Sequence, residues 1–160
     1  MKARYVDIYL EDLIKIAKKA IEKALENYKV AIVGWSSGKD SSLTLDLTIK
    51  TLVQMKQDGK KTPLLIVHTN DTTVELPEVI KHARQETKKI KSFLDDTGLE
   101  YLISVGKPSL TNTWAVQLLT GRKLPTYRDK KTADCSVDYK VNTGTRSIKA
   151  ALKSKKLILS

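Results

Sequence analysis

The 160-residue chain contains one cysteine, Cys135, so it can form neither an internal disulfide nor a metal site built from several cysteines. No hydrophobic run approaches the length of a membrane span, and the charged N-terminus has no signal-peptide pattern. Internal repeats and low-complexity tracts are also missing. We therefore expect a single cytoplasmic domain with no membrane partner, long enough to bury a hydrophobic core.

Acidic residues are scarce in the last quarter of the chain. Residues 1–120 contain 18 basic and 15 acidic side chains, whereas residues 121–160 contain 11 basic and 3 acidic ones, so most of the net charge of +11 lies there. An excess of positive charge suits a polyanionic partner, either a nucleotide or a nucleic-acid backbone. A solvated lysine-rich surface explains the composition equally well.

The hydrophobic pattern predicts alternating helices and strands. The predicted helices span residues 7–27, 41–58, 77–97, 113–119 and 147–157, and the predicted strands span 30–33, 64–67 and 100–105. Continuous apolar strands such as 64–67 are typical of parallel sheets buried on both faces. The sequence therefore predicts a three-layer α/β fold with helices on both faces of a parallel sheet. The single domain would comprise an N-terminal helix (1–29), a βαβαβ core (30–106) and a basic segment (107–160).

A Gly/Ser-rich loop between the first predicted strand and the next helix is the strongest functional signal. It contains Ser36, Gly38, Lys39, Ser41 and Ser42, which we assign to a pyrophosphate or phosphosulfate group because small residues and a helix N-terminus expose amides to anions. The spacing matches neither the Walker A pattern nor the G-x-G-x-x-G fingerprint. The alternative is a plain turn without a ligand.

Acidic residues near this loop need a different explanation, because a carboxylate repels phosphate. Asp40 either holds a Mg²⁺ ion, which we favour, or caps the loop. Asp71 and Glu75 follow the second strand and would hold ribose hydroxyls, Mg²⁺ or a basic residue, although Glu75 suits a helix N-terminus equally well. Asn70 is also well placed for a ligand, whereas His68 is more typical of a hydrogen-bonded structural residue.

The basic segment supplies the remaining candidates. Arg128 and Arg146 would reach a leaving pyrophosphate, and Cys135 is either a reactive thiolate that carries sulfur or a buried inert side chain. The candidate nucleotide-binding residues are Trp35, Ser36, Ser37, Gly38, Lys39, Asp40, Ser41, Ser42, Asn70, Asp71 and Glu75, and the candidate catalytic residues are Lys39, Asp40, Arg128, Cys135 and Arg146.

Three stretches resemble one enzyme superfamily. The S-x-G-K-D-S loop at 36–42 resembles the PP-loop of N-type ATP pyrophosphatases and PAPS reductases, with Ser37 where the family usually has glycine. Residues 68–77 (H-T-N-D-T-T-V-E-L-P) are similar to the S-S-D-T-x-V-E-x-P stretch of DndC-like sulfurtransferases, which act in DNA phosphorothioation. Trp114, the turn 121–125, Arg128 and the segment 135–140 loosely resemble a third family region.

The resemblance implies an adenine nucleotide alpha hydrolase-like fold that uses ATP and Mg²⁺. ATP would be split into AMP and pyrophosphate, and the adenylate would activate a backbone phosphate or another oxygen for sulfur replacement. A sulfur-donor protein of the cysteine desulfurase type, a nucleic acid bound by residues 121–160 and a homo-oligomer are the implied partners. With one cysteine, this chain alone cannot hold a four-cysteine iron–sulfur cluster.

Two alternative functions stay open. The chain lacks the E-C-G-L-H tail of PAPS reductases, which makes sulfonucleotide reduction a weaker alternative. A shortened nucleotide-binding subunit that acts only within a complex is the other alternative, and it predicts tight nucleotide binding without turnover.

Overall fold

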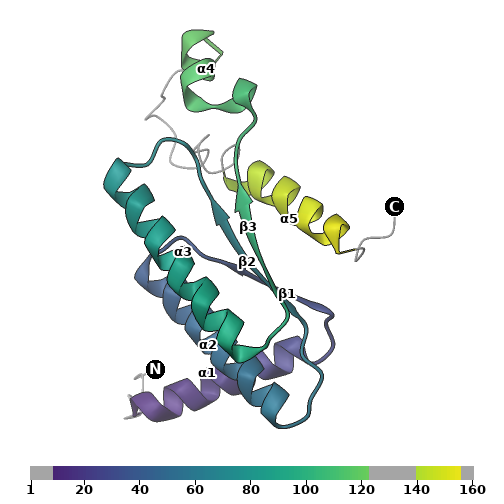
Figure 1. The fold of residues 1–160 in the computed structure, drawn as a ribbon. Coiled ribbons are helices and arrows are strands. Elements are labelled where there is room, and N and C mark those ends of the chain that lie inside the picture. The colour runs from purple at the N-terminus through teal and green to yellow at the C-terminus, as the bar shows by residue number, and fades with distance from the viewer. Residues whose placement is uncertain (1–8, 123–139, 156–160) are drawn as a thin grey trace, which may run out of the picture.

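The computed structural model of the chain describes residues 9–122 and 140–155. Its elements are α1 (Leu10–Leu25), β1 (Val30–Gly34), α2 (Lys39–Gln57), β2 (Leu64–Asn70), α3 (Pro77–Thr97), β3 (Tyr101–Gly106), the 3₁₀ turn η1 (Leu110–Asn112), α4 (Trp114–Leu119) and α5 (Thr143–Ser154) (Figure 1). The candidate residues Arg128 and Cys135 lie outside the described residues.

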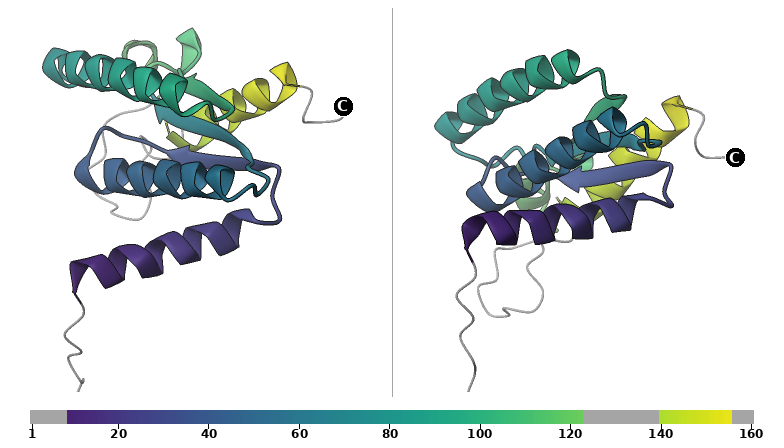
Figure 2. Two further views of the ribbon diagram at one scale, coloured as in Figure 1. Left: turned by 60° about the horizontal axis from the view of Figure 1, so that its bottom comes forward. Right: turned by 90° about the horizontal axis from the view of Figure 1, so that it is seen from below.

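The three strands form a parallel sheet in the order β1-β2-β3. Right-handed crossovers between strands added in one direction place their helices on one face, and α2 and α3 accordingly share a face. Helix α5 covers the other face at β2 and β3 (Figure 2). The predicted α/β fold, with helices on both faces of a parallel sheet, is confirmed for the described residues.

The hydrophobic core lies between the sheet and helix α2. Alternate residues of a strand point to one face, so Ala31 and Val33 of β1 share the core face with their register partners Leu65 and Val67 of β2. Helix α2 packs Leu45, Ile49, Leu52 and Met55 against them, and α3 adds Leu94. Leu52, Leu65 and Leu94 are fully buried, so the first βαβ unit forms the centre of the domain.

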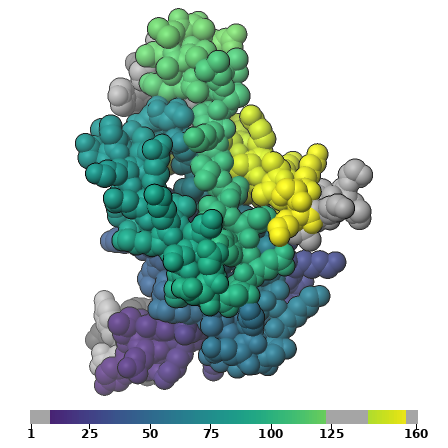
Figure 3. Space-filling model, in the orientation of Figure 1, coloured from purple at the N-terminus to yellow at the C-terminus, as the bar shows by residue number. Residues whose placement is uncertain are grey.

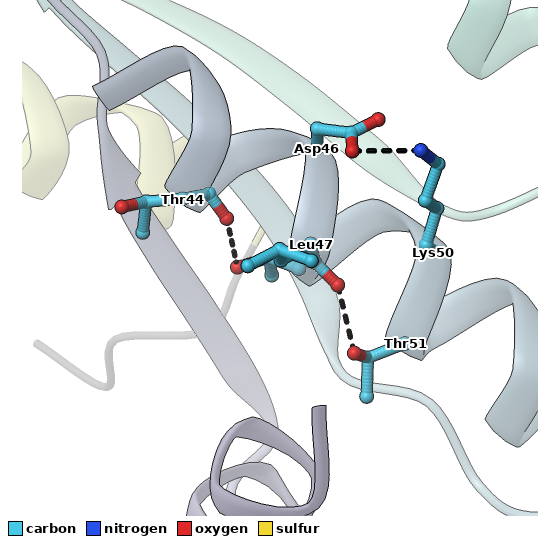
Figure 4. A network of polar contacts seen from close by, with 6 residues as sticks. Thr44, Asp46, Leu47, Lys50 and Thr51 are labelled. Atoms are coloured by element: carbon cyan, nitrogen blue, oxygen red, sulfur yellow. Dashed lines mark hydrogen bonds and ion pairs between the residues drawn. The ribbon is translucent and has the colours of Figure 1, made fainter. Parts of the chain in front are cut away.

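The buried threonines of helix α2 fit in this core because their hydroxyls are hydrogen-bonded within the helix. Thr48 and Thr51 are buried, and their hydroxyls donate to the carbonyl oxygens of Thr44 and Leu47, one turn earlier, at 2.8 and 2.7 Å. Figure 4 shows these bonds beside the exposed Asp46–Lys50 ion pair at 2.8 Å. Because each buried hydroxyl has an acceptor, the core does not incur the cost of an unpaired polar group.

Helix α1 packs mainly against α2 rather than directly on the sheet (Figure 2). Its predicted amphipathic stripe is half-buried at Ile14, Ala17, Ile21 and Leu25, and none of its residues is fully buried. An ion pair between Glu22 and Lys60, at 2.5 Å, ties the helix to the loop before β2. No helix in the described part of the chain is both long enough and apolar enough to cross a membrane.

Three predicted boundaries were wrong. Strand β2 continues through His68 to Asn70, because His68 contacts Ser147 of α5 and Asn70 donates to Lys140 in the turn before α5, partners that the sequence does not reveal. Helix α2 begins at Lys39 rather than at Ser41 or Ser42. Helix α5 begins at Thr143 rather than at Ser147, after a π-helical turn at residues 140–142, because its first turn is buried against the sheet.

Close packing at the end of β3, chiefly by Asn70 of β2 and also by Thr143 of α5, favours glycine at residue 106. A methyl group on Gly106 would overlap Asn70 Oδ1 and would lie 3.2 Å from Thr143 Cγ2 on α5. A methyl group on Gly34, at the end of β1, would meet nothing within 4 Å. Both glycines lie at the same edge of the sheet, but only residue 106 lacks space for a side chain.

We predict that Gly106→Ala lowers the free energy of unfolding by about 1–3 kcal/mol, the usual cost of overpacking a well-packed site. Gly34→Ala serves as the matched control and should change it by much less. Chemical denaturation of the two variants checks this, and equal destabilisation of both would contradict the close packing of α5.

Candidate functional site

The predicted phosphate loop lies at the carboxyl edge of the sheet, between β1 and α2. The backbone N–H of Trp35 donates to the carbonyl oxygen of His68 at 2.7 Å, which fixes the loop beside the end of β2. The Trp35 side chain is 4% exposed and belongs to the core, and its indole N–H donates to Ser42 Oγ at 3.1 Å. Trp35 therefore supports the loop from below rather than offering its ring to a ligand.

Five consecutive backbone amides are free to bind an anion. Helix α2 starts after Gly38, which provides no side-chain cap, and the amides of residues 37–41 have no hydrogen-bond acceptor among the described residues. The first amides of a helix point along its axis toward the loop and carry its partial positive charge. We call residues 36–42 the phosphate cradle.

The serine hydroxyls bind one another across the cradle. Ser36 Oγ lies 3.1 Å from Ser41 Oγ, the Ser36 amide donates to Ser41 Oγ at 3.2 Å, and the Ser41 hydroxyl lies 3.0 Å from the Gly38 carbonyl oxygen that it bonds. The Ser37 hydroxyl donates to the Ser36 carbonyl oxygen at 2.6 Å. These bonds hold the turn in shape in the absence of a ligand.

Ser37 stores backbone strain in the cradle. Its φ of 57° lies in the left-handed region, which costs a residue with a side chain about 1–2 kcal/mol. This is the position at which the resemblance leads one to expect glycine. Strained residues gather at ligand-binding turns, where the surrounding structure holds them in place. At Ser37 the conformation turns the following amides toward the start of α2.

Gly38 matters to the cradle because it has no side chain, not because of its backbone conformation. Its φ of −83° is available to any residue, and a methyl group on it would lie 3.4 Å from Ser36 Oγ and 3.9 Å from Ser41 Oγ, without a clash. Such a methyl group would lie beside the hydrogen-bonded hydroxyls of Ser36 and Ser41. The fold therefore tolerates alanine at residue 38.

Lys39 and Asp40 form the first turn of α2, and both are exposed. Neither side chain has an ion-pair partner among the described residues. In the part of the chain that the structure describes, no group of three His, Cys, Asp or Glu side chains could hold a metal ion. A Mg²⁺ ion at Asp40 would thus depend on ligand phosphate oxygens, which is how Mg²⁺ usually binds nucleotides.

The candidates after β2 lie at the same edge but face different partners. Asp71 Oδ2 lies 3.3 Å from Lys107 Nζ, and its other oxygen accepts the Thr73 amide at 3.1 Å, so Asp71 holds a basic residue of the segment after β3. Glu75 Oε1 accepts the Thr72 hydroxyl at 2.5 Å. Glu75 Oε2 is buried without a hydrogen-bond partner among the described residues, so a donor or cation that reached it would be stabilised.

Asn70 and His68 bind helix α5 instead of facing the cradle. Asn70 Nδ2 donates to the Lys140 carbonyl oxygen at 3.2 Å, and Asn70 Oδ1 lies 3.2 Å from His68 Nε2. His68 Nδ1 lies 3.3 Å from the hydroxyls of both Ser104 and Ser147. We call these five residues the His68 network. The expectation that His68 is a hydrogen-bonded structural residue agrees with these contacts.

Sequence reasoning missed Ser104 and Ser147, which complete the network. The only sign of these two residues in the sequence is that they are small and polar at positions where the pattern of buried residues would favour apolar side chains. Arg146, by contrast, is exposed in the first turn of α5. Arg128 and Cys135 lie outside the described residues, so the structure adds nothing about them.

A groove of about 320 Å³ adjoins the phosphate cradle along β1. Helix α1 contributes Ile21, Ala24 and Leu25 to its wall, and Ser41 and Thr44 of α2 form the end next to the cradle. The remaining lining residues are Ala31, Ile32, Val33 and Gly34 of β1 and Thr48 of α2. The cradle thus opens beside a largely apolar surface.

The His68 network generates a prediction about pH. Burial lowers the pKa of His68 below its ordinary value of 6.5, because a buried imidazolium loses hydration. The unfolded chain therefore takes up this proton first as the pH falls, and stability drops between pH 6.5 and the lower pKa of the folded state. The loss is at most about 1.4 kcal/mol per pH unit for one group.

We expect His68→Asn to have a flatter dependence of the free energy of unfolding on pH between 7.5 and 5 than the wild type. An NMR titration of His68 in the wild-type protein measures its pKa directly, and a value at or above 6.5 would contradict this account.

Comparisons of the chain with protein-family models, with curated proteins and with solved structures found no match.

Proposed function

We propose that the phosphate cradle binds ATP together with Mg²⁺ and that the chain cleaves ATP between the α and β phosphates. The run of free amides at residues 37–41 carries the proposal, because it offers directional donors to a compact anion at a helix N-terminus. The S-x-G-K-D-S sequence supports it by its resemblance to the PP-loop of ATP pyrophosphatases.

Each cradle residue has a defined task in this proposal. The amides of residues 37–41 bind oxygens of the β and γ phosphates, and Lys39 adds a positive charge at the mouth of the cradle. Asp40 would hold Mg²⁺ through phosphate oxygens, and the ion would supply charge neutralisation. Donors already in place stabilise charge that develops on a leaving group without reorganisation, so the cradle favours departure of pyrophosphate.

The proposed reaction is transfer of the adenylyl group. An acceptor oxygen attacks the α phosphorus, the bond to the bridging oxygen breaks, and pyrophosphate leaves with the bonding electrons. The acceptor is a phosphate oxygen or another oxygen. A sulfur nucleophile then attacks the phosphorus, or other atom, that carries the adenylated oxygen, and AMP leaves together with that oxygen and the bonding electrons. The acceptor and the sulfur transfer follow from the resemblance to DndC-like sulfurtransferases, with a cysteine desulfurase-type donor.

The first test of the proposal uses purified protein with Mg²⁺ and ATP labelled at the α and γ phosphates. With water as the acceptor in this assay, we expect AMP and pyrophosphate as products. We expect loss of both nucleotide binding and turnover in Lys39→Ala, because the main mobile charge at the cradle is gone. Lys50→Ala, in an exposed ion pair on the same helix, is the matched control and should retain both.

The possible outcomes separate binding from chemistry. Bound but uncleaved ATP would reject the pyrophosphatase assignment and support either a nucleotide-binding subunit or a sulfonucleotide reductase, which adenylyl sulfates would then distinguish. Unchanged ATP affinity in Lys39→Ala, with a wild-type melting temperature, would reject the cradle assignment itself.

Gly38→Ala provides a sharper probe, because it adds one methyl group where the fold has room for it. We expect a melting temperature close to that of the wild type and affinities for both ATP and inorganic pyrophosphate that are at least tenfold weaker in calorimetry. Wild-type affinity for both ligands would show that phosphates do not approach residue 38 closely.

A further inference from the structure

We infer that the outer face of helix α5 binds the phosphodiester backbone of a nucleic acid. This surface consists of Arg146, Lys149 and Lys153, which we call the α5 cationic face. It lies outside the phosphate cradle and requires no ATP. The inference therefore stands or falls independently of the proposed ATP chemistry.

Helical geometry places the three cations in one row. They are spaced i, i+3 and i+7, so they lie on one side of the helix and span about 10 Å along its axis. All three are exposed, and none has an ion-pair partner among the described residues. A nucleic-acid strand carries one charge per ~3.4 Å of helix axis, so the row matches about three phosphates.

The opposite side of α5 fixes the orientation of this row. Thr143 and Gly144 are buried against the sheet, and Ser147 joins the His68 network. The cations therefore point away from the sheet, and Figure 3 shows α5 at the molecular surface. Because the structure already holds this helix in place, a partner would not have to order it on binding.

Helix α5 differs from the other lysine-rich helices because it contains no acidic residue. Described residues 140–155 include Lys140, Lys155 and the three cations of the face, without a single Asp or Glu. Helix α1 interleaves its lysines with acids, for example in the Asp12–Lys15 pair at 3.6 Å. Helix α3 carries Glu78, Glu86, Asp95 and Asp96 beside its own basic residues. Of these three helices, α5 alone contains no acidic residue.

A nucleic acid fits this face better than a membrane surface does. Helices that bind bilayers insert a bulky apolar side into the lipid while their cations contact the headgroups. The apolar side of α5, with Ile148, Ala151 and Leu152, is half-buried in the domain, and its free side contains only charged and small residues next to the row. Cations of this kind bind phosphates through a salt-dependent release of counterions.

The test is fluorescence anisotropy of the full chain, without nucleotide, with a labelled DNA duplex and a labelled single strand between about 50 and 200 mM salt. Each phosphate contact on duplex DNA contributes about 0.9 to the slope of log K against log salt. We expect the triple variant Arg146→Gln, Lys149→Gln and Lys153→Gln to weaken binding and to flatten that slope by about 2–3. Glutamine maintains helix propensity, and a thermal melt verifies the fold.

Helix α3 offers a matched control with three cations at the same spacing. The triple variant Lys81→Gln, Arg84→Gln and Lys88→Gln removes the same charge from exposed positions, and we expect it to retain most of the wild-type slope. Equal losses in both variants would reject the α5 assignment and leave only the effect of net charge. Absence of DNA binding by the wild-type chain, or equally tight binding of polyglutamate, would reject recognition of phosphodiesters.

Discussion

The parallel pairing of β1, β2 and β3 determines where the candidate site residues in the described part of the chain lie. Parallel strands all end at one edge, so Gly34, Asn70 and Gly106 are brought together there from distant parts of the sequence. The helices that cover the sheet run back from this edge, and both α2 and α5 therefore begin at it. A one-residue slip between β1 and β2 would turn Ala31 and Val33 away from α2 and break the bond from Trp35 to His68.

The two faces of the sheet are held by different forces. On the α2 side, aliphatic residues such as Leu52 and Leu65 bury apolar surface. Apolar packing of this kind stabilises the fold strongly and tolerates small shifts of the packed side chains. On the α5 side, the His68 network joins Ser104 to Ser147 across the interface, and hydrogen bonds of this kind require one register. A buried polar group that loses its partner is costly, so the network fixes the rotation of α5 more tightly than apolar contacts alone. That rotation determines which residues of α5 face solvent.

The sequence predicted the helices and strands that depend on residues close together in the chain. Periodicity located α1, α2 and α3, Pro77 and Gly98 marked the ends of α3, and Gly98 indeed adopts the left-handed conformation. Prediction from the sequence failed where contacts between residues far apart in the chain determine the structure. Polar residues at the end of β2 looked like a loop, because nothing local shows that His68 and Asn70 meet Ser147 and Lys140, which lie seventy or more residues later. The strand-to-helix turn at residues 36–42 was predictable because its shape depends on consecutive residues, whereas the contacts of Asn70 with the turn before α5 were not.

The two surfaces that we propose to bind anions differ in physical character, and this difference bears on which anion each would bind. The cradle presents backbone dipoles, which act over a short range and in fixed directions, beneath a strained turn at Ser37. Asp40 stands beside it, so a bare phosphodiester would be repelled there unless a cation intervened, as in a nucleotide–metal complex. The α5 cationic face presents full charges on long side chains without a neighbouring acid, which attract phosphates over a Debye length in any orientation. A compact, metal-bound anion thus suits the cradle, and an extended polyanion suits α5.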